Sequence, residues 1–212
     1  MAEPVDRRAR RRLETRRNIS YAATALFAEK GFDNVTIDEI AAAADVGRMT
    51  VFNHFPRKED MFFDRDEEIR QTLCAALRQR EEGVSPIETL RLLAWQLIAE
   101  NRPFLQFSPD SQDFIAIIQA SETLKARARQ IRDEIAHTLA ARLAEIAGHD
   151  QPTAEAKLAA ALLLASWSVA LIEAHDVYRA THDSALAAKA FLTLIDKGAT
   201  GQKAALAGTP YV

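Results

Sequence analysis

The sequence is poor in residues that crosslink a chain or break its helices. Among 212 residues there is one cysteine, Cys74, and there are only seven glycines and seven prolines. A single cysteine excludes an internal disulfide and is typical of a reducing cytoplasm, so we expect Cys74 to be a small core residue and not a nucleophile. A 48% hydrophobic content with so little glycine and proline excludes fibrous and disordered classes and favours an all-helical globular protein.

A long hydrophobic run is also lacking. The longest, residues 158–172, is interrupted by Ser166 and Ser168 and is shorter than the ~20 residues that a membrane-spanning helix needs. The arginine-rich start is not followed by the apolar stretch of a secretory signal. We therefore expect a soluble, cytoplasmic protein with no membrane partner.

Positive charge is slightly outnumbered by negative charge overall, 27 Lys and Arg against 30 Asp and Glu, but it is concentrated at one end. The net charge is −3, yet residues 4–58 hold 11 Lys and Arg against 7 Asp and Glu, and five arginines fall within residues 7–12. A basic segment in an acidic chain indicates an anionic partner for that segment. A merely solvated N-terminal arm would contain the same arginines, so both interpretations stay open.

Hydrophobic periodicity predicts helices throughout, with no strand and no internal repeat. Gly31 is expected to end the first helix in a left-handed conformation, and Thr36 with Glu39 forms a capping box that opens the second. Further starts are expected at Ser85 and Ser108. The helices are expected at about residues 10–30, 36–44, 47–55, 58–80, from 85, from 108, 124–146, 152–178 and 184–197, with a loose tail from residue 199.

The short helix over residues 47–55 has two contrasting faces. Val51 and Phe55 share one face and are expected in the core, whereas the opposite arc carries Met49, Thr50, Asn53 and His54, with Arg48 in the first turn. Arginine pairs with guanine, asparagine with adenine, and apolar atoms contact the thymine methyl group. Because another short helix ends only a few residues earlier, the pattern indicates a helix-turn-helix whose second helix enters the major groove of double-stranded DNA.

The stretch TIDEIAAAADVGRMTVFNHFPRKEDMF, which begins at Thr36, resembles the DNA-binding region of TetR-family transcriptional repressors. The upstream stretch ATALFAEKGFDNVT fits the same family. The detailed resemblance covers roughly residues 18–63, and the rest of the chain resembles the family only in its helical architecture.

The resemblance implies roles for individual positions. Bases would be read by Arg48, Met49, Thr50 and Asn53, and phosphates contacted by Thr36, His54 and Lys58. Phe52 stands where the family usually has tyrosine, so one phosphate-contacting hydroxyl is missing. Asp45 stands where glycine is usual, and aspartate tolerates a left-handed backbone better than most residues. Structural roles remain as alternatives: Thr36 as a cap only, Met49 as a partly buried filler, Asn53 as a solvated side chain and His54 as a helix C-cap.

We expect residues 1–58 to form a three-helix DNA-binding domain with a basic arm, and residues 59–212 a larger helical ligand-binding and dimerisation domain. Residues 158–172 are apolar on nearly every face and need a cover on both sides. Two such helices from each of two chains would form a four-helix bundle. The resemblance implies a homodimer through the last two helices, and the candidate contacts are Leu162, Val169, Leu186, Phe191 and Leu194. A dimer calls for a pseudo-palindromic operator.

The resemblance also implies a pocket for an unknown small-molecule effector among the middle helices. The candidate lining residues are Trp95, Phe104, Phe107, Phe114, Ile118, Trp167 and His175, with Asn101, Gln106 and His137 as further polar candidates. Ordinary core packing explains each aromatic side chain equally well. Effector binding would favour a conformation in which the two reading helices are wrongly spaced for DNA.

Two rival functions differ in class. An enzyme could use Glu134 with His137, or Glu173 with His175 and Asp176. No HExxH pattern or glycine-rich phosphate loop is present, so we predict no catalytic, metal or cofactor site. A non-specific binder of nucleic acid or anionic membrane could use the arginines of residues 7–17 alone. We favour a ligand-responsive DNA-binding regulator, and a repressor over an activator.

Overall fold

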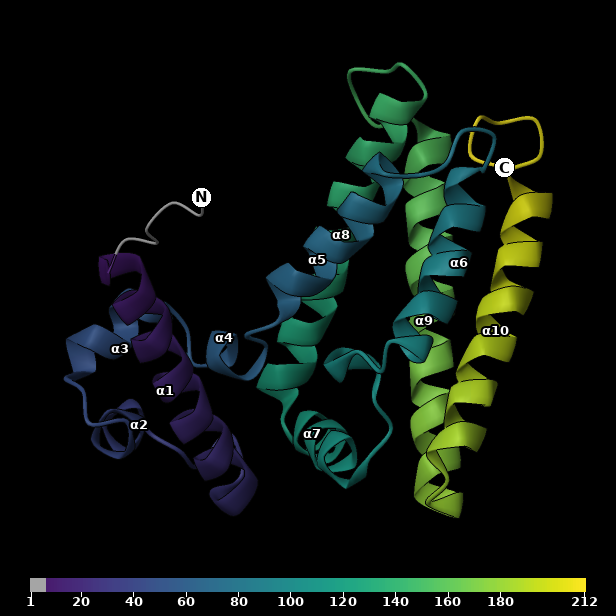
Figure 1. Ribbon diagram of the computed structural model, residues 1–212. Helices are drawn as coiled ribbons and strands as arrows, with labels where there is room; N and C mark the ends of the chain where they lie inside the picture. The colour runs from purple at the N-terminus through teal and green to yellow at the C-terminus, as the bar shows by residue number, and fades with distance from the viewer. Residues whose placement is uncertain (1–6) are drawn as a thin grey trace. The chain divides into compact units, whose positions relative to one another are not determined.

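The computed structural model describes residues 7–212, so the first six residues of the expected arm lie outside it. Within that range every regular element is a helix, which confirms the predicted all-α class (Figure 1). The elements are α1 (Arg7–Lys30), α2 (Ile37–Ala43), α3 (Arg48–His54), α4 (Glu59–Phe62), α5 (Asp66–Arg78), α6 (Pro86–Ala99), the 3-10 turn η1 (Pro103–Leu105), α7 (Pro109–Ala120), α8 (Glu122–Ile146), α9 (Ala154–Thr181) and α10 (Ser184–Ala205).

The chain forms two compact units. Unit 1 contains the described residues up to Asp64 together with Asp113–Arg127, and unit 2 contains Arg65–Gln112 and Ala128–Val212. The packing of unit 1 extends past residue 58, where we placed the end of the DNA-binding domain, because Met61 and Phe62 are buried in its core. A functional boundary at residue 58 stays a prediction.

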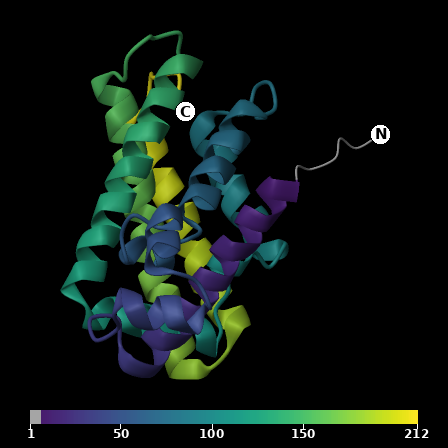
Figure 2. The same cartoon turned by 90° about the vertical axis from the view of Figure 1, so that its left-hand side faces the viewer.

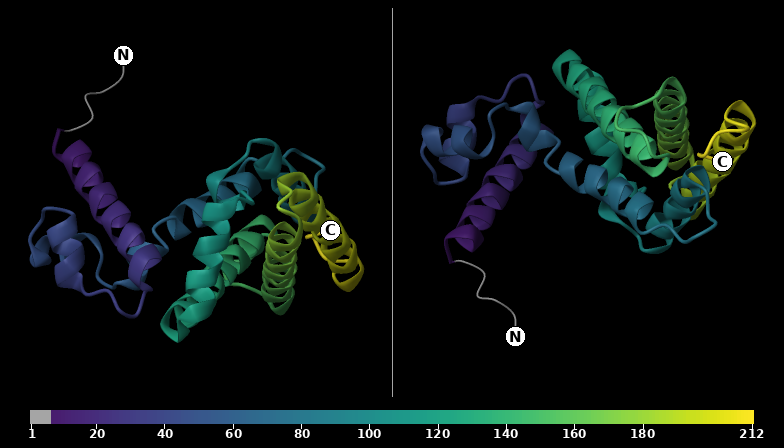
Figure 3. Two further views of the ribbon diagram at one scale, coloured as in Figure 1. Left: turned by 90° about the horizontal axis from the view of Figure 1, so that it is seen from below. Right: turned by 90° about the horizontal axis from the view of Figure 1, so that it is seen from above.

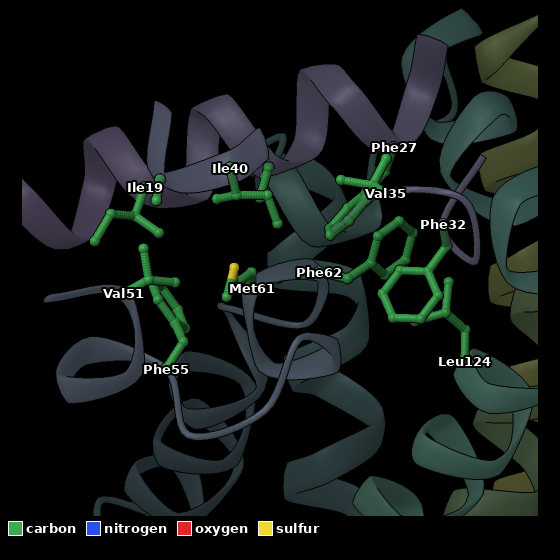
Figure 4. Close-up of a cluster of buried hydrophobic side chains, with 12 residues drawn as sticks. Ile19, Phe27, Phe32, Val35, Ile40, Val51, Phe55, Met61, Phe62 and Leu124 are labelled. Atoms are coloured by element: carbon green, nitrogen blue, oxygen red, sulfur yellow. The ribbon is translucent and has the colours of Figure 1, made fainter. Parts of the chain in front are cut away.

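Unit 1 has a single hydrophobic core built from five helices and the loop after α1 (Figure 4). Helix α2 packs on α1, and α3 packs on α2 (Figure 3). Leu124, from α8, is fully buried among side chains from residues 19–62. The core contains Ile19, Ala23, Phe27, Phe32, Val35, Ile40, Ala41, Val51, Phe55, Met61, Phe62 and Leu124.

The predicted helix ends around α2 are confirmed. Thr36 Oγ1 accepts from the Glu39 backbone N–H at 3.3 Å, and the Glu39 carboxylate accepts from the Thr36 backbone N–H at 2.8 Å. A hydrogen bond from Lys30, followed by those from Thr36, lowers the pKa of Glu39 to about 2. Gly31 and Asp45 have φ values of 79° and 51°, the left-handed conformation expected for both.

The single helix predicted over residues 58–80 is wrong. Helix α4 ends at Phe62 and α5 begins at Asp66, with Phe63 at φ −99° and ψ 43° between them. The helix breaks because its first turns belong to unit 1. There the Phe62 ring stacks on Phe114 at 4.4 Å, and Ser20 Oγ donates to Asp64 Oδ2 at 2.5 Å.

Unit 2 is organised around α9 and α10, which lie side by side and antiparallel (Figure 1, Figure 2). The expectation of a loose tail from residue 199 is wrong, because α10 continues to Ala205. Beyond it, Leu206 and Tyr211 are almost fully buried, and the Ile87 backbone N–H donates to the Tyr211 carbonyl at 3.2 Å. Packing against α6 therefore orders the end of the chain, although its small residues alone predict a loose tail.

Helix α9 is longer than the apolar run suggested. Within residues 7–212 it is the one helix whose 28-residue length and composition would allow it to cross a membrane, and 44% of its most apolar window is buried. A core helix of a water-soluble protein passes the same test, and Leu163, Trp167 and Ala170 of α9 are buried inside unit 2.

Candidate nucleic-acid interface

Helix α3 is anchored on one side and open on the other. Val51 and the capping residue Phe55 are fully buried. Met49 is 70% exposed, which rules out the alternative of a buried filler, and Arg48 and Asn53 are also exposed. Thr50 and His54 are half-buried at the edge of this surface. The division of the helix into two faces is as predicted.

The turn before α3 orients this exposed face. Asp45 has a left-handed backbone and donates its N–H to the Ala42 carbonyl at 3.2 Å, while Val46 donates to the Ala41 carbonyl at 3.0 Å. Gly47 is the N-cap of α3 and makes no side-chain capping bond. Two short helices joined by a tight turn of this kind form a helix-turn-helix.

Arg48 lies at the surface and contacts Asp38 and Phe52. Its Nη1 lies 3.0 Å from Asp38 Oδ2, and its guanidinium carbon lies 5.7 Å from the centre of the Phe52 ring. Because both partners of the ion pair are more than half exposed, the pair contributes little to stability. The arginine can therefore exchange Asp38 for a guanine edge at small energetic cost.

Lys58 is engaged inside unit 1. Its Nζ donates to the carbonyls of Phe32 at 2.7 Å and Val35 at 2.8 Å and lies 4.2 Å from the centre of the Phe32 ring. Burial lowers the pKa of Lys58. Two of its three N–H donors therefore hold the loop between α1 and α2, and one remains for a phosphate. No sequence signal predicts this contact, because it joins segments more than 20 residues apart.

His54 is the last residue of α3 and lies beside arginines of α1. Its backbone carbonyl accepts a hydrogen bond from Arg16 Nη1. Burial first, and then the positive charges of Arg12 and Arg16, lower the pKa of the His54 imidazole. A neutral imidazole at pH 7 carries one N–H donor, which suits a single hydrogen bond to a phosphate oxygen.

Arg16 differs from the other arginines of the basic segment. The arginines at positions 7, 8, 10, 11, 12 and 17 are exposed, whereas Arg16 is half-buried. The sequence contained a signal for this difference that we missed. Arg16 precedes Ser20, Ala23 and Phe27 at steps of four, three and four residues, so it lies on the buried face of α1.

The described residues contain no group of three or more His, Cys, Asp or Glu side chains that could hold a metal ion. Cys74 is buried, as expected. Of the residues considered for an enzyme, His175 is buried beside Gln112 whereas Glu173 is exposed.

Three of the seven effector-pocket candidates come together in unit 2. The Phe107 ring lies 5.2 Å from the His175 ring, and Phe191 lies 6.3 Å from Phe107 and 5.8 Å from Trp167. Burial lowers the pKa of His175, whose Nδ1 lies 3.2 Å from Gln112 Nε2. Within the part of the chain that the structure describes, the buried Trp167 Nε1–H has no hydrogen-bond acceptor.

The other four candidates are placed elsewhere. Phe114 and Ile118 belong to unit 1, and Phe114 stacks on Phe62. Trp95 is exposed and donates its Nε1–H to Asp196 at 3.0 Å, and Phe104 is half-buried.

Unit 1 also has an unpredicted groove of about 470 Å³, lined mainly by the end of α1, the following loop and α7.

Four of the five dimerisation candidates are at least partly accessible, and one is buried. Val169 and Leu186 are exposed, and Leu162 and Leu194 are half-buried. Phe191 is fully buried in the core of unit 2, so it has no surface to offer a partner. One face of α9 carries five exposed apolar residues and the half-buried Leu162, and we call this face the α9 stripe; it consists of Leu158, Ala161, Leu162, Ala165, Val169 and Ile172.

Comparison with curated proteins finds relatives of the N-terminal part of the chain. The transcriptional regulator TcmR of Streptomyces glaucescens is 31% identical over 83 residues, which is 39% of this chain and 37% of TcmR. The putative mycofactocin biosynthesis regulator MftR of Mycobacterium tuberculosis is 45% identical over 49 residues, 23% of this chain and 25% of MftR. The matched region thus spans well under half the length of either relative.

Solved structures resemble nearly the whole chain. Salmonella enterica GusR is 25% identical with a TM-score of 0.52, over 92% of this chain and 96% of GusR. SmeT bound to triclosan is 19% identical with a TM-score of 0.57, over 89% of this chain and 91% of SmeT, a likeness of fold. The family model described as "Bacterial regulatory proteins, tetR family" matches residues 19–64, which contain the helix-turn-helix of unit 1. The N-terminal domain, residues 19–64, therefore belongs to the TetR family of bacterial regulatory proteins, and the whole chain shares its fold with solved regulators of that family.

Proposed function

We propose that the chain is a cytoplasmic, dimeric, sequence-specific transcriptional repressor that a small-molecule effector releases from a pseudo-palindromic operator. One observation carries the proposal. Helix α3 presents Arg48, Met49 and Asn53 to solvent while the fully buried Val51 and Phe55 hold the opposite side. Exposed side chains of these types, on a helix with a fixed orientation, suit the edges of bases in a major groove.

Phosphate contacts would fix the register of α3 on the duplex. Thr36 and Lys58 lie at the two ends of the helix-turn-helix segment, and His54 lies at the end of α3. His54 and Lys58 each keep one donor that can face a phosphate oxygen. The N–H and hydroxyl of Thr36 both donate to the Glu39 carboxylate, at 2.8 and 2.9 Å, so Thr36 would have to turn its hydroxyl away from Glu39 to reach a phosphate. Phe52 has no hydroxyl, so the exposed arginines of α1 would supply more of the affinity than in relatives with tyrosine there.

Selection of the purified protein against random double-stranded DNA tests the proposal. We expect enrichment of a palindrome whose half-sites are about one helical turn apart. Replacing Arg48 or Asn53 with alanine should weaken binding to that site by about 5- to 150-fold each, which corresponds to ~1–3 kcal/mol per base contact. Fluorescence anisotropy with the selected duplex and an unrelated duplex measures the loss.

Arg10→Ala is the matched control, because Arg10 is an exposed arginine of α1. This substitution should lower the affinity for both duplexes by the same factor and reduce the salt slope of binding by ~1. If Asn53→Ala also weakened both duplexes equally, and no site were enriched, the chain would be a non-specific binder that depends on its arginines.

The α9 stripe supports the proposed homodimer. Val169 and Ile172 are 58% and 61% exposed, and a continuous apolar surface of this kind on a helix is typical of an interaction site. Leu186 of α10 is also exposed. A second copy of the chain can cover all of these side chains through a symmetric helix pairing.

Replacing Val169 with aspartate is expected to convert the dimer to a monomer, because it would place a charge in the centre of the apolar contact. Sedimentation velocity checks the change in mass, and affinity for the palindrome should fall with it. Leu92→Asp is the control, since Leu92 is a comparably exposed apolar residue on α6. A Val169→Asp protein that sediments like the wild type would remove the α9 stripe from the proposed interface.

For the effector we propose an apolar ligand with a hydrogen-bond acceptor. Phe107 and His175 lie together in unit 2 and are linked to Trp167 through the Phe191 ring, and the buried Trp167 Nε1–H has no acceptor among residues 7–212. SmeT, whose fold is similar, has been solved with triclosan and is described as the repressor of the Stenotrophomonas maltophilia multidrug efflux pump SmeDEF. Release of the protein from its selected duplex provides the assay in which candidate effectors are compared.

A further inference from the structure

The reading helix α3 is short and has few anchors. It spans seven residues, and Val51 is its only buried residue, with Phe55 buried directly after it. The last carbonyls of any helix have no partner within the helix. Its orientation therefore depends on whatever holds its C-terminal end.

Arg16 of α1 makes two contacts at that end. Its Nη1 donates to the carbonyl of His54, and its guanidinium carbon lies 3.9 Å from the centre of the Phe55 ring. A guanidinium satisfies an otherwise unpaired carbonyl, interacts favourably with the negative end of the helix dipole and stacks on an aromatic ring. The three effects together hold the end of α3 against α1.

These contacts distinguish Arg16 from an arginine that binds phosphate. One N–H is bonded to a carbonyl of the protein, one face of the guanidinium covers a buried ring, and the side chain is half-buried. Its neighbour Arg17 is exposed. The two adjacent arginines of α1 therefore have different environments, and the difference can be measured.

We propose that Arg16 is a positioning residue: it fixes the C-terminal end of α3 on α1, and so determines how Arg48 and Asn53 meet the bases, without contacting DNA itself. The proposal rests on the proposed DNA-reading function, but the contact with α3 can be tested in the protein alone.

The first measurement is amide hydrogen exchange in the DNA-free, full-length protein. Arg16→Met should speed exchange in the segment 48–55 by about tenfold, as expected from the loss of a hydrogen bond to a charged group. Arg17→Met should leave exchange in that segment unchanged. Arg16→Lys keeps the charge but not the planar group, so it should fall between Arg16→Met and the wild type.

The second measurement is binding to the selected and unrelated duplexes across a range of salt concentrations. Arg16→Met should lower the affinity for the selected duplex by about tenfold or more. It should leave the salt slope of binding unchanged, because no phosphate contact is removed. Arg17→Met should lower the affinity for both duplexes by the same factor and reduce the salt slope of binding by ~1.

Each outcome decides the matter. If Arg16→Met lowered the salt slope and left exchange in α3 as in the wild type, Arg16 would be a phosphate contact and the proposal would be overturned. If Arg16→Met unfolded unit 1, Arg16→Lys would be used for the same two measurements. Amide exchange in α3 at the wild-type rate, together with a lowered salt slope of DNA binding, would then overturn the proposal. If the wild type selected no site, the proposed function would fail while the exchange result still tested the contact.

Discussion

Replacing Leu124 with alanine is expected to destabilise unit 1 by about 2–5 kcal/mol, the usual effect of removing a fully buried leucine side chain. Leu124 lies near the start of α8, about sixty residues beyond α4, yet it is completely buried in the core that includes Phe27 and Phe62. Urea unfolding followed by amide exchange over residues 19–64 measures the effect on unit 1. Affinity for the selected duplex should fall with it.

Leu92→Ala is the control for this prediction, because Leu92 is exposed on α6 of unit 2. It should change stability by less than about 0.5 kcal/mol. Equal effects of the two substitutions would show that Leu124 is not part of the core of the DNA-binding unit.

Three polar or aromatic contacts also indicate that residues 113–127 belong to unit 1. The ring of Phe114 stacks on Phe62, and Ser121 Oγ donates to Asp33 Oδ1 at 2.9 Å. Arg127 Nη2 lies 3.2 Å from Asp60 Oδ1, and the two side chains are only 8% and 18% exposed. Removing one partner of so buried an ion pair is strongly destabilising, so this segment belongs to the unit by electrostatics as well as by packing.

Gly198→Ala is expected to destabilise unit 2 by about 1–3 kcal/mol, the range typical of overpacking a core. A Cβ atom at position 198 would lie 2.5 Å from Oγ and 2.7 Å from Cβ of Ser166, across the contact between α9 and α10. Ser166 has little freedom to move, because its Cβ is fixed to the α9 backbone and its Oγ donates to the Leu162 carbonyl at 2.9 Å. The two helices would have to separate. Thermal unfolding measures the cost.

Gly201→Ala is the matched control on the same helix. Apart from the adjacent residues and the nearby backbone of α10 itself, no heavy atom of the described residues lies within 4 Å of the Cβ position at residue 201. Alanine should therefore stabilise α10 by about 0.5–1 kcal/mol through its higher helix propensity. Adding Ser166→Gly to Gly198→Ala should recover part of the loss, since it removes both close atoms. If Gly198→Ala stabilised the protein as Gly201→Ala does, the close approach of α9 and α10 would be wrong.

The features that could be predicted from the sequence are local in the chain. The capping box of Thr36, the left-handed residues Gly31 and Asp45 and the two faces of α3 each depend on residues within one or two helical turns. Their physical causes act between near neighbours, so a single sequence contains them.

The features that could not be predicted depend on contacts between distant segments. The break between α4 and α5 follows from the contact of Ser20 with Asp64, and the order of the tail from the contact of Ile87 with Tyr211. The engagement of Lys58 by loop carbonyls is of the same kind. The pocket candidates were grouped by residue type alone, which does not determine the unit in which each aromatic lies.

The two-segment composition of unit 1 has a consequence for synthesis on the ribosome. The chain emerges from its N-terminus, and domains generally fold as units once all of their residues are available. Helices α1 to α4 emerge first, but the core around Phe27 and Phe62 is incomplete until residues 113–127, which include Leu124, have been translated. The nascent chain therefore exposes those phenylalanines while most of α5 to α7 is still being made, a period in which a chaperone that binds aromatic surfaces would find its substrate.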